Sequence, residues 1–135
     1  MSVLYWIFRI ILGVLITGAG VGKLLDVRGF VSIIKTYQLS LPMWLMWIIA
    51  IGIIVFEVVL GLWILFGNNL KTPAILSIMM HSGYFILLTT SLLRGLNLQN
   101  CGCFGVFLAR PLTWYSPLED IVLVIVSYGL FILAK

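Results

Sequence analysis

The stretch Met43–Phe66, MWLMWIIAIGIIVFEVVLGLWILF, decides the fold of this chain. It carries one ionisable side chain, Glu57, and it is long enough for a bilayer-spanning helix, which needs about 20 apolar residues. Three further stretches have the same character: Val3–Gly22, Thr72–Leu93 and Leu118–Ala134. Only 9% of the 135 residues are charged, too few to cover a soluble globular surface. The sequence therefore predicts an all-α, polytopic membrane protein with lipid as its solvent.

The four spans use most of the chain, so we expect one membrane domain over residues 1–135, a four-transmembrane-helix bundle. Gly67–Lys71 has the composition of a tight turn, which makes spans two and three an antiparallel hairpin. The longer link Lys23–Pro42 has apolar residues at helical spacing and predicts a short interfacial helix between spans one and two. Both termini then share one face with the tight turn. The pattern predicts contact with membrane lipid and no nucleic-acid partner.

The polar link Gly95–Pro117 carries the run Asn100-Cys101-Gly102-Cys103-Phe104-Gly105, which contains both cysteines. Thiols at positions i and i+2 can come within the distance that a disulfide tolerates, and the intervening glycine permits the required backbone angles. So small a ring is easily reduced, and it closes too short a loop to stabilise the fold strongly. Cys101 and Cys103 are therefore candidate catalytic residues for thiol–disulfide exchange.

Two arginines, Arg94 and Arg110, flank the cysteines and are expected to stabilise a thiolate. The same two thiolates could instead hold Cu(I) or another soft ion, which makes Cys101 and Cys103 alternative metal ligands. A zinc site would be incomplete, because no further Cys or His lies nearby in the sequence.

Two further ionisable residues, Glu57 and His81, lie deep within spans two and three. A carboxylate in the bilayer is costly unless it is paired or protonated, and a contact between Glu57 and His81 would relieve that cost. The pair is a candidate proton relay or a contact for a quinone headgroup. The structural alternative is a buried hydrogen-bonded pair that fixes helix packing.

Three local patterns make structural predictions. Arg9 lies inside the first span, and we expect it to extend its charged end to a membrane face, with an inward-facing functional charge as the alternative. Gly18 and Gly22 form a small-xxx-small pair, with Gly13 and Thr17 one position earlier, and this pattern indicates a helix contact. Ser116-Pro117-Leu118-Glu119 fits a capping box with Ser116 as the N-cap of the last span.

Three segments resemble the MauE branch of the DoxX-like membrane proteins. They are Gly18-Ala19-Gly20-Val21-Gly22-Lys23-Leu24-Leu25-Asp26, Phe56-Glu57-Val58-Val59-Leu60-Gly61-Leu62 and the Cys-Gly-Cys-Phe-Gly run that begins at Cys101. Their order and spacing cover nearly the whole chain. The start of span four departs from the family pattern, because Glu119-Asp120 stands where an Arg-Asn pair is expected. A role for a basic residue there is therefore in doubt.

The resemblance implies a protein of the bacterial inner membrane that takes part in thiol–disulfide traffic beside a thioredoxin-like protein, in the maturation of exported proteins. The leading hypothesis is a membrane thiol–disulfide oxidoreductase or electron conduit, with a membrane quinone as the other reactant. A soft-metal binding or transport protein and a structural anchor subunit of a larger complex are the alternatives.

Membrane orientation is ambiguous in the sequence. The expected loop face carries Lys23, Arg28, Lys35, Arg94 and Arg110. Taken alone, the positive-inside rule puts that face in the cytoplasm. A redox-active disulfide belongs on the oxidising side, so we expect the cysteine loop at the periplasmic face.

Overall fold

The computed structural model describes residues 3–96 and 111–134 and is entirely helical within them. Four long apolar helices meet the length and composition of membrane spans: α1 (Val3–Leu24), α3 (Met43–Phe66), α4 (Lys71–Leu93) and α5 (Tyr115–Leu133). The short helix α2 (Val27–Thr36) lies between α1 and α3 in the chain. These elements confirm the predicted fold class.

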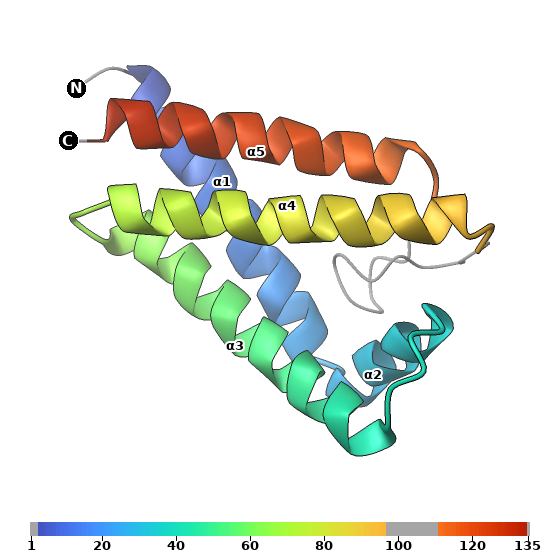
Figure 1. Ribbon diagram of the computed structural model, residues 1–135. Helices are drawn as coiled ribbons and strands as arrows, with labels where there is room; N and C mark the ends of the chain where they lie inside the picture. The colour runs from blue at the N-terminus through green and yellow to red at the C-terminus, as the bar shows by residue number, and fades with distance from the viewer. Residues whose placement is uncertain (1–2, 97–110, 135) are drawn as a thin grey trace.

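The long helices form two pairs that meet at one end and diverge at the other (Figure 1). α1 packs antiparallel along α3, and α4 packs along α5, whereas α3 and α4 contact each other at few points. The predicted hairpin of spans two and three therefore has a tight turn but separated arms. Both chain ends and the α3–α4 turn lie where the pairs meet, as predicted, and α2 lies near the open end.

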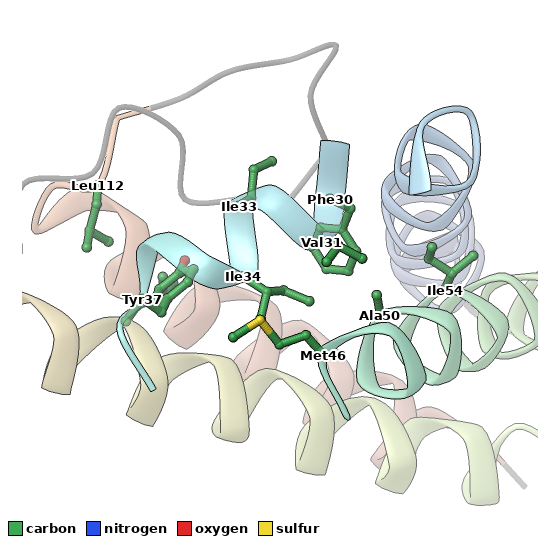
Figure 2. Close-up of a cluster of buried hydrophobic side chains, with 10 residues drawn as sticks. Phe30, Val31, Ile33, Ile34, Tyr37, Met46, Ala50, Ile54 and Leu112 are labelled. Carbon is green, nitrogen blue, oxygen red and sulfur yellow. The ribbon is translucent and has the colours of Figure 1, made fainter. Parts of the chain in front are cut away.

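Two hydrophobic clusters hold the pairs together. Where the pairs meet, all four long helices contribute, for example through Leu12, Leu60 and Leu130. At the open end, one face of α2 packs against the first half of α3 and reaches Leu88 on α4 (Figure 2). We call this second cluster the α2 cluster. Among the described residues, its buried members are Phe30, Val31, Ile33, Ile34, Tyr37, Met46, Ala50, Ile54, Leu88 and Leu112. Burying this face explains why α2 is strongly amphipathic.

Arg9 extends its charged end to the turn that follows α3, where it is buried and not exposed. Its side chain is 8% exposed. Its Nε donates to the carbonyl of Ile64 at 2.8 Å, and Nη2 donates to the carbonyl of Gly67 at 2.6 Å. These carbonyls belong to the C-terminal end of α3, where helix carbonyls lack intrahelical partners and carry partial negative charge. Arg9 therefore joins the first half of α1 to the end of α3.

The predicted capping box at the last span was wrong. α5 begins at Tyr115, and Trp114 precedes it without a side-chain capping bond. The backbone N–H of Tyr115 donates to Thr113 Oγ1 at 3.3 Å, and that of Ser116 donates to the Thr113 carbonyl at 3.0 Å. The helix thus begins two residues earlier than the Ser-Pro pattern indicates. Pro117 is still accommodated, because a first-turn residue needs no intrahelical N–H bond.

Candidate functional site: a buried lysine–glutamate–tyrosine cluster

A cluster of polar side chains lies between the two hydrophobic clusters, inside the membrane-spanning part of the molecule. Lys23 of α1 forms an ion pair with Glu57 Oε1 of α3, and the two side chains are 2% and 1% exposed. The hydroxyl of Tyr84 on α4 donates to the same oxygen at 2.5 Å. We call these three residues the Lys–Glu–Tyr cluster. It joins three helices and bridges the two helix pairs where α3 and α4 otherwise diverge.

Glycines in the α1–α3 contact bring Lys23 to Glu57. A Cβ added at Gly20 would lie 3.1 Å from Glu57 Cβ, and one at Gly61 would lie 2.7 Å from the Thr17 backbone nitrogen. The backbones therefore approach as closely as small residues allow. Gly18 meets nothing within 4 Å, whereas Gly13 and Thr17 both face α3, so the predicted contact is made by Gly13 and Thr17 and not by Gly18. The same face includes Gly20.

Lys23 was expected in a loop, but it lies in the last turn of α1. The contacts of Gly20 and Gly61 set an antiparallel register in which α1 ends beside the middle of α3. The Lys23 ammonium also lies 5.3 Å from the centroid of the Phe30 ring and 5.4 Å from that of Tyr84. Both distances suit cation–π attraction, which is strongest where water is excluded.

The predicted contact between Glu57 and His81 was wrong. Glu57 binds Lys23 and Tyr84, whereas His81 binds Ser77. His81 Nδ1 lies 2.9 Å from the Ser77 carbonyl, which can only accept, so Nδ1 is the donor. The Ser77 hydroxyl lies 2.7 Å from that of Ser127 on α5, and Ser127 donates to the Leu123 carbonyl. These bonds tie α4 to α5. The His81 and Tyr84 rings meet edge to face with centroids 6.2 Å apart, so His81 borders the Lys–Glu–Tyr cluster.

An apolar cavity of about 100 Å³ adjoins the Lys–Glu–Tyr cluster between α2, α3 and α4. Lys23 and Tyr84 line one part of it. Phe30, Ile34 and Tyr37 of the α2 cluster line another. A mostly apolar wall with a few placed polar groups is typical of small-molecule sites, although those sites usually have about 300 Å³ or more.

Cys101, Cys103 and Arg110 lie outside the described residues. The residues on either side of that segment are placed. Leu112 is buried in the α2 cluster and Leu96 packs against it. Arg94 donates to the carbonyls of Tyr37 at 2.9 Å and Gln38 at 3.0 Å, directly after α2. The role of Arg94 beside a thiolate stays a prediction, and its observed bonds hold the end of α4 to the end of α2.

Lys23 and Tyr84 are site residues that sequence reasoning missed. One signal was present, because an intramembrane carboxylate needs a cation and Lys23 directly follows the first apolar stretch. Tyr84 follows His81 by three residues, which places both on one helix face. Among residues 3–96 and 111–134, no group of three His, Cys, Asp or Glu side chains has the arrangement of a metal site.

Comparison with known protein families identifies the family of this chain. A family model described as methylamine utilisation protein MauE matches residues 1–134. Neither a curated protein nor a solved structure matches the chain significantly. The family match covers almost the entire sequence and agrees with the four apolar helices. This integral membrane protein therefore belongs to the MauE family, which is involved in methylamine utilisation.

Proposed function

We propose that this protein is a membrane thiol–disulfide oxidoreductase that uses Cys101 and Cys103. A thioredoxin-like partner transfers two electrons and two protons to their disulfide, so that the partner becomes oxidised and the pair becomes a dithiol. The dithiol then gives both electrons and both protons to a membrane quinone, which leaves as quinol. This cycle would serve the maturation of disulfide-containing exported proteins.

The observation that carries the proposal is the placement of the residues on either side of the cysteine pair. Leu96 and Leu112 both pack on the α2 cluster, and Arg94 is bonded to the backbone that follows α2. The segment that contains both cysteines therefore starts and ends against a cluster that also lines the apolar cavity. A polar segment whose flanking residues pack on a membrane domain suits exchange with a partner on one side and a lipophilic reactant on the other.

The proposal is tested with purified protein in nanodiscs, reduced thioredoxin as electron donor and decylubiquinone as acceptor. Cys101→Ser and Cys103→Ser should each abolish thioredoxin oxidation, because one thiol cannot complete the two-electron step. Thr113→Ser is the matched control, since it changes an exposed residue near the same segment and should leave the rate unchanged. Unchanged thioredoxin oxidation in both cysteine variants would contradict the proposal.

A titration with Cu(I) under reducing conditions separates this function from metal binding. Exchange chemistry predicts no tight stoichiometric complex. Tight binding that is lost in either cysteine variant, together with unchanged thioredoxin oxidation, would instead support soft-metal binding by the same two thiolates.

A further inference from the structure

The cavity beside the Lys–Glu–Tyr cluster continues into a surface groove. The groove has a volume of about 520 Å³ and shares Ile49, Ile53 and Tyr84 with the cavity wall. Gly52 and Gly83 line the groove, and a Cβ added at either glycine would meet nothing within 4 Å. The groove thus runs between α3 and α4 on a surface of exposed apolar residues. A molecule dissolved in the bilayer can reach the cavity sideways along this groove.

The shape of this space fits a ring that carries an apolar chain. An apolar cavity of about 150 Å³ holds benzene, so the cavity of about 100 Å³ admits only part of a substituted six-membered ring, and the rest of the ring lies in the adjoining groove. Phe30, Tyr37 and Tyr84 supply aromatic rings to its wall. The adjoining groove is larger and bordered by apolar side chains, which suits a flexible hydrocarbon chain.

The charges of the site favour a neutral headgroup with hydrogen-bonding oxygens. Lys23 is compensated by Glu57, so the pair offers no net charge to an anionic lipid headgroup. An ammonium has three N–H donors, whereas the contact with Glu57 Oε1 uses one of them. Lys23 also lines the cavity, which puts an N–H donor within reach of a carbonyl oxygen there.

We propose that the cavity binds the headgroup of a membrane quinone and that the α3–α4 groove holds its chain. Lys23 donates a hydrogen bond to a quinone carbonyl, and Tyr84, whose hydroxyl donates to Glu57, borders the headgroup with its ring. The redox use of this site rests on the proposed function, but the binding itself does not. The site would also give the cysteines a diffusible reactant, because the α2 cluster contributes to the cavity wall and contacts both ends of their segment.

The test measures quenching of tryptophan fluorescence by decylubiquinone in nanodiscs. All proteins carry Cys101→Ser and Cys103→Ser, so binding is measured apart from thiol chemistry. Tyr84→Phe should raise the dissociation constant about 3- to 10-fold, since Glu57 then loses one donor and engages more of the Lys23 ammonium. The matched control is Tyr128→Phe, which removes the hydroxyl of an exposed tyrosine on α5 and should leave the constant unchanged.

A second pair of variants tests the groove without disturbing a core contact. Gly83→Leu should raise the dissociation constant for decylubiquinone about tenfold or more, because the new side chain occupies the groove. Binding of 2,3-dimethoxy-5-methyl-1,4-benzoquinone, which has no chain, should change little. Gly18→Leu is the control, since Gly18 is equally unobstructed and lies on α1.

Equal quenching in all four variants would show only partition into the lipid and would overturn the proposed site. Thioredoxin oxidation by the protein with intact cysteines is measured separately. If thioredoxin is still oxidised but the protein does not bind the quinone, the proposed site is wrong and the proposed function stands. If the quinone binds specifically but thioredoxin is not oxidised, the site stands and the proposed function is wrong.

Discussion

At the scale of single residues, the central feature is a lysine and a glutamate that are both almost completely buried. Such a pair stabilises a protein little by itself, because the cost of removing two charges from water offsets their attraction. Lys23 and Glu57 nevertheless lie beside a cavity and accept a third partner, Tyr84. An ionisable pair inside a membrane protein is more often retained for binding or transport than for stability.

Breaking this pair from one side should destabilise the fold. Lys23→Met leaves Glu57 buried without its cation and should lower the free energy of unfolding by about 3–5 kcal/mol. Lys23→Met combined with Glu57→Leu should recover part of that loss, because no uncompensated charge remains. Denaturation in mixed micelles measures the free energy of unfolding of the single and the double variant. Lys35→Met, at an exposed lysine of α2, is the control and should stay within about 0.5 kcal/mol. A single variant as stable as the wild type would refute the pairing.

At the scale of helices, the close α1–α3 contact positions the cluster. Gly61→Ala should cost about 1–3 kcal/mol of unfolding free energy, because the new Cβ would lie 2.1 Å from Thr17 Oγ1. Gly52→Ala on the same helix meets nothing within 4 Å and should stabilise by up to about 1 kcal/mol. Thermal unfolding in detergent compares the two. Equal effects of the two substitutions would show that α1 and α3 are not this close.

The bond from α4 to the end of α2 is a second element-scale feature. Arg94→Gln removes the two-pronged contact with the carbonyls of Tyr37 and Gln38. Amide hydrogen exchange should then become faster from Tyr37 to Ser40, while exchange in the middle of α5 stays the same. Arg28→Gln, at an exposed arginine on α2, is the control. Unaltered exchange at residues 37–40 would show that Arg94 does not hold this segment.

At the scale of the whole molecule, the apolar stretches predicted the helices well because bilayer thickness fixes span length independently of packing. They did not predict the diverging pairs. Arg9 and Lys23 were both assigned to membrane faces, yet each is buried against α3. Sequence position gives the depth of a charge along its own helix but not the neighbouring helix it meets. Glu57 was identified as unusual, whereas its partners depended on the α1–α3 register.

The arrangement also sharpens the question of orientation. With Arg9 and Lys23 buried, the remaining positive charges still favour the α2 end, so the positive-inside rule and the redox argument continue to disagree. We predict that a membrane-impermeant maleimide labels Cys101 and Cys103 from the periplasmic side. Asn68→Cys in a background without these two cysteines should be labelled from the opposite side, because it lies in the turn at the other end. Labelling of the native pair only from the cytoplasm would rule out a role in periplasmic oxidation.

The coupling of the two cysteines to a membrane quinone is tested most directly by a stoichiometry. Fully reduced protein in nanodiscs is mixed with decylubiquinone without oxygen, and free thiols and quinol are counted together. Both thiols should disappear and one quinol should form per protein, with no reaction in Cys101→Ser or Cys103→Ser. Thiols that persist while the quinone remains oxidised would exclude this electron transfer.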